Sequence, residues 1–336
     1  MKNILLIKLT AMGDVIHALP VSYAIKETFP DAKITWVVEP QFREIVEMNP
    51  CVDYIITFHK KEFKTFKGLW KNLLPFRREI QDDHYDLVMD LQGLFKSAAI
   101  AFFAKADQKI GTCDMREGSD KISKRIVGEH CQDHVVQRYL DSARAIGCKV
   151  NEIKFPIEIP KNEEFKAKQL LSSEGVQIGN PYVVLAVGAS WATKRWKAEY
   201  FARLAEKLYE TEVVPVLVGS GVVDAYIAHE IENSMDVPPV NLVDRVNLKQ
   251  LAFTLKHARL VVGADTGPTH LAVALKTRTI MLMGATNPQR TGSFDQQENI
   301  IMVDRPCKMC MKKSCETDCL EKISVDMVVE KISTMK

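Results

Sequence analysis

The sequence predicts an α/β protein with two doubly wound, parallel-sheet domains, and three observations predict it. Short apolar runs rich in β-branched residues alternate with helical patterns along most of the chain, which is typical of βαβ units. A length of 336 residues suits two domains of roughly 150 residues each. Residues 151–181 combine prolines with a charged stretch and separate the two halves as the expected connection.

The predicted elements follow in chain order. In the first half we expect strands at residues 3–9, 33–39, 53–58 and 86–92, with helices at about 15–28, 41–48 and 94–104. In the second half we expect strands at 182–188, 213–219, 259–264 and 279–284, with helices near 197–210, 222–233, 248–257 and 267–275. The predicted domains are residues 1–165, residues 178–320, and a C-terminal helix in 321–336 that packs back on the N-terminal domain. Ligands are expected in a cleft between the domains, at the carboxyl ends of the strands.

Composition and charge exclude several function classes. Hydrophobic residues make up 46% and charged residues 26% of the chain, which is ordinary for a globular protein. The net charge of +2 provides no global field for nucleic acid, so no nucleic-acid partner is expected. The N-terminal run MKNILLIKL is too short and too charged for a signal peptide, and no stretch reaches the roughly 18 apolar residues of a membrane span. These features predict a cytoplasmic protein with mostly reduced thiols.

The first strand-to-helix corner, in LIKLTAMGDVIHALPVS (residues 6–22), carries a single glycine and a carboxylate. The three-glycine fingerprint of dinucleotide-binding proteins is missing, which argues against NAD chemistry. We expect Gly13 to form a tight turn and a helix to begin near Val15, with its positive end keeping Asp14 ionised. Asp14 as a simple helix N-cap is the competing interpretation.

Two corners in the second half are typical of anion sites. In GADTGPTHLAVAL a strand ends at Gly263, and Thr266 and Pro268 open a helix whose free N–H groups suit a diphosphate. In GASWATKRW, Lys194 and Arg195 precede a helix start, where a phosphate meets both cations and N–H groups. The competing interpretations are a capped helix without ligand and solvated surface charges.

Further candidates are less specific. Asp224 follows a third strand-glycine turn and suits a ribose hydroxyl, and Gln92 and Lys96 follow the strand at 86–92. Residues 58–79 place Phe63, Phe66, Trp70 and Leu73 at helical spacing among basic residues, namely Lys60, Lys61, Lys64, Lys67, Lys71, Arg77 and Arg78. This pattern fits either a helix packed on its own domain or a surface for anionic lipid or an acidic acceptor.

Four of the eight cysteines crowd into CKMCMKKSCETDC, at Cys307, Cys310, Cys315 and Cys319. Four thiols opened by a two-residue gap match structural zinc sites in ligand type and number, although the later spacings are tighter than usual. Reduced thiols or a conditional disulfide are the alternatives. A zinc ion held by four thiolates would be structural, because no coordination position stays open.

Taken together, AMGDVIHALP, DLQGLFKSA, GASWATKRW and GADTGPTHLAVAL resemble, in kind and in order, the glycosyltransferase family 9 enzymes, the ADP-heptose:lipopolysaccharide heptosyltransferases. The Met-Gly-Asp-Val-x-His form is more similar to heptosyltransferase I than to heptosyltransferase II. The cysteine cluster departs from the heptosyltransferase I pattern, although similar clusters occur in other members. The family's acidic residue for the donor ribose, expected just after Gly219-Ser220, is not matched in place, and Asp224 comes slightly late.

The resemblance implies a GT-B fold, with two Rossmann-like domains facing across a cleft, an inverting transfer, and no cofactor required for catalysis. It implies Asp14 as the general base and Lys194 as the cation near the donor phosphates. The predicted donor-binding residues are Gly188, Ser190, Thr193, Lys194, Asp224, Asp265, Thr266, Gly267 and His270. The predicted acceptor-binding residues are Met12, Gly13, Lys60, Lys61, Lys64, Gln92 and Lys96.

The implied substrates are ADP-heptose and a Kdo-lipid A acceptor. We therefore expect a protein at the cytoplasmic face of the inner membrane, in peripheral contact with its anionic surface. Two other function classes stay open on the same two-domain plan. One is a nucleotide-sugar isomerase or hydrolase, and the other is a sugar-nucleotide binder without catalysis.

Overall fold

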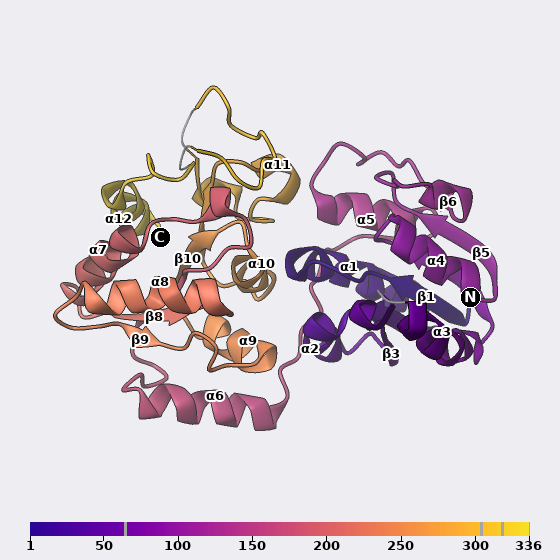
Figure 1. Cartoon of the computed structure of the whole chain (residues 1–336), viewed down its shortest axis with the longest axis horizontal. Coiled ribbons are helices and arrows are strands. Elements are labelled where there is room, and N and C mark those ends of the chain that lie inside the picture. The colour runs from indigo at the N-terminus through magenta and orange to yellow at the C-terminus, as the bar shows by residue number, and fades with distance from the viewer. Residues whose placement is uncertain (64–65, 303–304, 317–318, 336) are drawn as a thin grey trace. The chain divides into compact units, whose positions relative to one another are not determined.

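The computed structural model describes residues 1–63, 66–302, 305–316 and 319–335, with side chains for all of these except residues 63 and 66–70. The chain divides into two compact units, Met1–Glu158 and Ile159–Lys336. Each unit is built on a six-stranded sheet, and all of the strand pairs are parallel (Figure 1). The predicted pair of doubly wound α/β domains is confirmed.

The sheet of the first unit has the strand order β3-β2-β1-β4-β5-β6. Its strands are β1 (Asn3–Ile7), β2 (Lys33–Val38), β3 (Tyr54–Thr57), β4 (Tyr85–Asp90), β5 (Ala106–Gly111) and β6 (Lys124–Arg125). Its helices are α1 (Met12–Thr28), η1 (Pro40–Phe42), α2 (Arg43–Glu47), η2 (Lys60–Phe63), α3 (Phe66–Gln81), α4 (Phe95–Phe103), η3 (Ser119–Lys121) and α5 (Val135–Arg144). The order reverses between β1 and β4, where Ile7 lies opposite Asp90.

The sheet of the second unit has the order β12-β11-β10-β7-β8-β9, with its reversal between β7 and β10. Its strands are β7 (Tyr182–Ala186), β8 (Val214–Val218), β9 (Val240–Asn241), β10 (Leu260–Ala264), β11 (Thr279–Met283) and β12 (Ile300–Met302). Its helices are α6 (Lys161–Ser173), η4 (Ala192–Lys194), α7 (Ala198–Tyr209), α8 (Val222–Asn233), α9 (Leu248–Lys256), α10 (Gly267–Ala274), α11 (Pro288–Thr291), η5 (Gln297–Asn299) and α12 (Val325–Thr334). Ligands of such sheets bind beyond the strand ends at the reversal.

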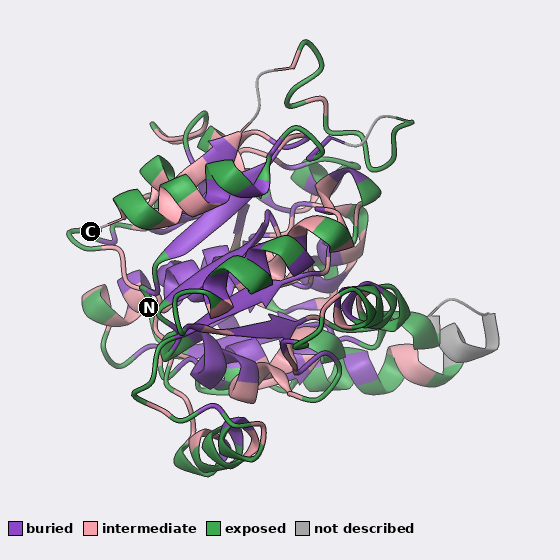
Figure 2. Ribbon diagram, turned by 90° about the vertical axis from the view of Figure 1, so that its left-hand side faces the viewer, coloured by how far each residue is buried: buried purple, intermediate pink, exposed green. Residues whose placement is uncertain are grey.

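The strands at each reversal are buried, as helices on both faces require of a parallel sheet. β7, β10 and β11 are buried at every residue, and Figure 2 shows strands in purple beneath helices with green outer faces. Trp196 anchors the start of α7 in the second core, where its indole N–H donates to the Ile323 carbonyl over 2.8 Å. The loops that follow these buried strands therefore start from a rigid base.

Several elements differ from the predictions. Helix α6 lies inside the stretch predicted as the connection, because its sequence is mostly polar and it buries only Glu163, Ala167 and Leu171. Strands β5 and β9 were not predicted, since β5 buries only its last two residues, Ile110 and Gly111, and β9 has two residues. Helix α12 adds Val325 and Val328 to the core of the second unit and packs on α7, whereas the sequence analysis placed it against the N-terminal domain.

Glu163 fastens α6 to the rest of the second unit. Its carboxylate accepts hydrogen bonds from Asn247 (3.1 Å) and Gln250 (2.9 Å), which begin α9, and from Lys166 (2.7 Å). The hydrogen bond from Lys166, followed by those from Asn247 and Gln250, lowers the pKa of Glu163 to about 2. The ionised carboxylate therefore stabilises the fold.

We expect Glu163→Gln to weaken the acid dependence of stability. The stabilisation is complete above the pKa of an unfolded glutamate, about 4.3, and is lost as the pH falls toward 2, so the wild type loses more stability over that range than the variant. Urea unfolding midpoints at about pH 7, 4.5 and 3 measure this difference. Glu164→Gln, at the adjacent carboxylate, is the control; equal acid dependence in all three proteins would contradict the assignment.

Candidate functional site

The first corner, residues 8–14, joins β1 to α1. Helix α1 begins at Met12, so Met12 and Gly13 belong to its first turn rather than to the predicted tight turn. Asp14 is the third helical residue and is half-buried, and its Oδ2 accepts a hydrogen bond from the Ala11 N–H at 3.3 Å. The carboxylate therefore closes the helix start and stays partly accessible.

Gln92 and Lys96, which lie after β4 and in α4, hold the first corner. The Gln92 Oε1 accepts from the N–H groups of Leu9 (3.1 Å) and Thr10 (3.0 Å). The Lys96 ammonium donates to the Thr10 hydroxyl at 3.1 Å and to Glu39 at 2.9 Å. Gln92 thus fixes the backbone of the loop that carries Asp14, and Lys96 links the Thr10 side chain of that loop to the Glu39 carboxylate. Their role in acceptor binding stays a prediction.

Two buried charges beneath the corner were missed by the sequence analysis. Asp90, at the end of β4, is fully buried and accepts hydrogen bonds from the N–H groups of Gln92 and Gly93. Burial raises its pKa, and those hydrogen bonds oppose the shift. Lys8 is also buried and donates to the Leu91 carbonyl at 3.1 Å, and burial lowers its pKa. A polar residue directly after a buried strand was the available signal.

The structure describes only part of the basic segment, residues 58–79. Lys60 and Lys61 are exposed in η2, whereas Lys64 lies outside the described residues, as do the side chains of Phe63, Phe66, Lys67 and Trp70. In the rest of α3, Arg77 and Arg78 are exposed and Phe76 is buried. The described part thus has an apolar side toward its own unit and a basic side toward solvent.

The second site corner joins the loop after β7 to the loop after β10. Lys194, in η4, donates to the Asp265 carbonyl at 3.0 Å and to its Oδ2 at 2.8 Å. His270 Nε2 lies 2.7 Å from the other carboxylate oxygen of Asp265. Burial alone would raise the pKa of Asp265, but pairing with His270 and Lys194 outweighs it and holds that pKa below its usual range. Lys194 is thereby fixed as a cation beside Asp265.

The predicted helix start at this corner is present. Thr266 is the N-cap of α10, Gly267 is its first residue, and Pro268 follows. The Thr266 N–H donates to the Thr269 hydroxyl at 3.1 Å. His270 is buried against Asp265, so it orients the carboxylate that holds Lys194. A cation next to a helix N-terminus is well suited to bind a diphosphate.

Asp224 fills the space between two glycine turns. A Cβ placed on Gly188 would lie 1.8 Å from the Asp224 Oδ2, and one on Gly219 would lie 2.9 Å from it. The same oxygen accepts the Ser220 N–H at 2.9 Å. Burial raises the pKa of Asp224, and the Ser220 hydrogen bond opposes the shift. Glycine is needed at both turns because this carboxylate occupies the room.

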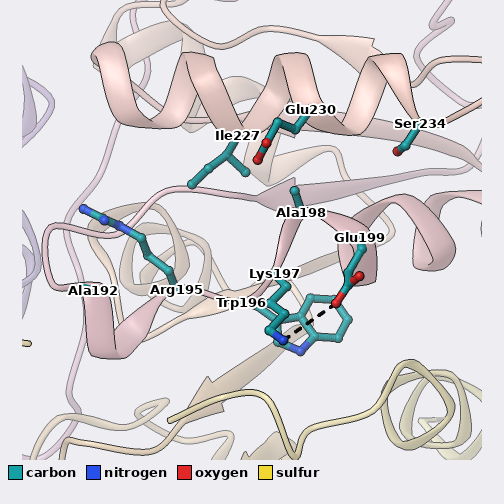
Figure 3. Close-up of a pocket in the computed structure, with 9 residues that line it drawn as sticks. All are labelled: Ala192, Arg195, Trp196, Lys197, Ala198, Glu199, Ile227, Glu230 and Ser234. Atoms are coloured by element: carbon teal, nitrogen blue, oxygen red, sulfur yellow. Dashed lines mark ion pairs between the residues drawn. The ribbon is translucent and has the colours of Figure 1, made fainter. Parts of the chain in front are cut away.

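The other predicted residues of the loop after β7 divide in two. Ser190 is exposed, whereas Thr193 is buried and its hydroxyl donates to the Lys312 carbonyl at 2.7 Å. Beside this loop lies a pocket of about 490 Å³, between the start of α7 and α8 (Figure 3). Figure 3 shows Lys197 paired with Glu199 on one side and Arg195 pointing away from them. Lys194 does not line this pocket, whose charges are mixed.

The cysteine cluster has no assembled metal site within the described part of the chain. There, no three Cys, His, Asp or Glu side chains are grouped so that they could hold a metal ion. Cys307 and Cys315 are exposed and Cys319 is buried. Burial raises the pKa of Cys319, and the nearby thiols of Cys310, Cys315 and Cys307 raise it further. Structural zinc at these four cysteines stays a prediction.

Comparison with known proteins places the chain in a family. A family model, glycosyltransferase family 9 (heptosyltransferase), matches residues 73–321. The lipopolysaccharide heptosyltransferase 1 of Pseudomonas aeruginosa is 30% identical over 322 residues, which cover 93% of this chain and 87% of that protein.

Two solved structures share the fold over nearly the whole chain. A family 9 glycosyl transferase from Veillonella parvula has a TM-score of 0.86 at 23% identity, with 99% of this chain and 96% of that chain covered. The E. coli heptosyltransferase WaaC with ADP has a TM-score of 0.79 at 24% identity, with 98% and 99% covered. Among the described residues, no helix has both the length and the apolar character to cross a membrane. The family match and the Pseudomonas relative show that this chain is a glycosyltransferase and belongs to glycosyltransferase family 9, the heptosyltransferase family.

Proposed function

We propose that the protein transfers a heptose from ADP-heptose to a Kdo-lipid A acceptor in the synthesis of the lipopolysaccharide inner core. The carrying observation is the Lys194–Asp265–His270 array at the start of α10, in a chain that also presents Asp14 at its first corner. Membership of family 9 and the relative named lipopolysaccharide heptosyltransferase 1 support these substrates.

The second unit would hold the donor. An ammonium group has three N–H donors, and Lys194 directs two hydrogen bonds at Asp265, so we assign the third to a diphosphate oxygen. The N-terminus of α10 adds the positive end of a helix. As the bond from the anomeric carbon to the phosphate oxygen breaks, negative charge grows on ADP and meets this fixed positive charge. Preorganised charge of this kind is usually the largest catalytic contribution, and the proposed reaction uses no metal.

The first unit would hold the acceptor and the base. The acceptor oxygen attacks the anomeric carbon on the face opposite the leaving ADP, which inverts the configuration. Its proton passes to the Asp14 carboxylate as the new bond forms. The first corner suits this role because Gln92 fixes the backbone behind Asp14 and Lys96 holds the Thr10 side chain.

Release of ADP from ADP-heptose, measured with and without Kdo-lipid A, tests the function. We expect release that depends on the acceptor, together with a heptosylated lipid product. Release without acceptor would indicate a hydrolase, and an altered sugar nucleotide without release would indicate an isomerase. Binding of ADP-heptose without any turnover would indicate a binder, so each of these results would contradict the proposal.

The substitution Asp14→Asn distinguishes the two possible roles of Asp14, general base and cap of helix α1. An asparagine amide oxygen can still accept the Ala11 N–H but cannot take the acceptor proton. We expect turnover to fall by about 10²–10⁴, with ADP affinity and melting temperature close to those of the wild type. Single-turnover kinetics and calorimetry measure the two effects, and near-normal turnover would restrict Asp14 to capping.

The basic segment is proposed to bind the anionic acceptor at the membrane surface. Changing Lys60 and Lys61 to alanine should raise the KM for Kdo-lipid A in anionic vesicles by about thirtyfold, since each lysine near such a surface contributes about 1 kcal/mol. Donor affinity should not change. The control pair is Lys105→Ala with Lys149→Ala, two exposed lysines of the same unit. Equal losses in both pairs, or for both substrates, would contradict this placement.

A further inference from the structure

The cysteine-rich segment, residues 305–316, runs along the carboxyl edge of the second sheet. The Met309 N–H donates to the Gly284 carbonyl at 3.0 Å, and the Met311 N–H donates to the Ala285 carbonyl at 2.8 Å. Gly284 and Ala285 directly follow β11, the neighbour of β10. The segment therefore lies at the edge of the sheet from which Asp265 extends.

The same segment is bound to the loop that carries Lys194. The buried Thr193 hydroxyl donates to the Lys312 carbonyl at 2.7 Å, and the Thr193 N–H donates to the Lys313 carbonyl at 3.5 Å. Both contacts use backbone oxygens of the segment, so they fix its path without engaging the lysine side chains. The cysteine-rich segment is thus held against the loop that carries Lys194.

The Lys313 side chain lies beside the ring of Trp191. The centroid of this ring lies 4.6 Å from the Lys194 Nζ and 5.7 Å from the Lys313 Nζ. Both distances fall within the range of cation–π contacts, about 6 Å. One indole ring therefore brings together a lysine of η4 and a lysine more than a hundred residues later in the chain.

The charges around this ring are not balanced. Lys194 is paired with Asp265, whereas no described carboxylate lies within ion-pairing distance of Lys313. Lys194 and Lys313 thus place two positive charges beside one ring, and an anion that contacts both would be attracted by each of them. A diphosphate at the start of α10 is such an anion, and it has oxygens for both cations.

We propose that Lys313 is a second cation for the donor diphosphate, delivered to the donor site by the cysteine-rich segment and positioned by Trp191 and Thr193. The inference rests on the proposed function, because it takes the ligand of this site to be a nucleoside diphosphate. It also gives the cysteine-rich segment a role that does not depend on the state of its thiols.

ADP and AMP binding by calorimetry, on the full chain without acceptor, tests the proposal. Lys313→Met should weaken ADP binding about tenfold and AMP binding by less than twofold, since one charge-assisted contact to the terminal phosphate is lost. The matched control is Lys308→Met, an exposed lysine of the same segment, which should keep both affinities. Lys313→Arg should retain most of the ADP affinity. Unchanged ADP binding in Lys313→Met, or equal losses in Lys308→Met, would overturn the assignment.

A double-mutant cycle tests the positioning. Thr193→Val removes the hydroxyl that holds the Lys312 carbonyl, so it should weaken ADP binding in the wild type and have a smaller effect in Lys313→Met. Independent effects would show that Thr193 does not act through Lys313 and would overturn its positioning role.

The proposed function can fail without the Lys313 proposal. If ADP binds but acceptor-dependent release is missing, the comparison of Lys313→Met with Lys308→Met still stands. If another nucleoside diphosphate replaces ADP, the same comparison is made with that nucleotide.

Discussion

The reversal of strand order in each parallel sheet is the constraint on which both site corners depend. At the reversal two neighbouring parallel strands end at the same edge, and the chain leaves them toward opposite faces of the sheet. In the first unit these strands are β1 and β4, with Ile7 opposite Asp90; in the second they are β7 and β10, with Ala186 opposite Gly263. Each corner is therefore built by two segments distant in sequence whose separation the sheet register fixes.

The two corners differ in how their charges are held. Asp265 is buried, and burying a carboxylate costs more than one surface partner can offset. Lys194 and His270 offset that cost together, so the ammonium position is set by the requirements of Asp265 itself. Asp14 is half-buried with a backbone N–H as its partner, which suits the proton transfer proposed for it.

The sequence is informative about residues whose environment is local and less so about the others. Apolar runs in the sequence predict the buried strands. The start of α10 is predicted by three adjacent residues, Thr266, Gly267 and Pro268. The contacts of Thr193 and Gln92 were not predictable, because their partners, Lys312 and the Leu9 N–H, come from distant segments.

Polar or short elements escaped prediction for a related reason. Helix α6 is mostly polar and is held by Glu163 through hydrogen bonds to α9. Its sequence therefore has no apolar periodicity that would predict a helix. Asp224, which the sequence analysis placed slightly late after Gly219-Ser220, lies in the first turn of α8. Its contact with Gly188 and Gly219 depends on how closely β7 and β8 approach, which only the folded sheet determines.

The missing glycines at the first corner have a physical explanation in the hydrogen bonds of that loop. A phosphate cradle needs free backbone N–H groups after the strand. Here the N–H groups of Leu9 and Thr10 donate to Gln92, and the Ala11 N–H donates to Asp14. These donors are already satisfied by side chains of the same unit, so a phosphate would have to displace them. A negatively charged Asp14 at the helix start would also repel that phosphate. The centre of the corner is therefore poorly suited to bind an anion, which fits the proposed acceptor group, a hydroxyl whose proton a carboxylate can accept.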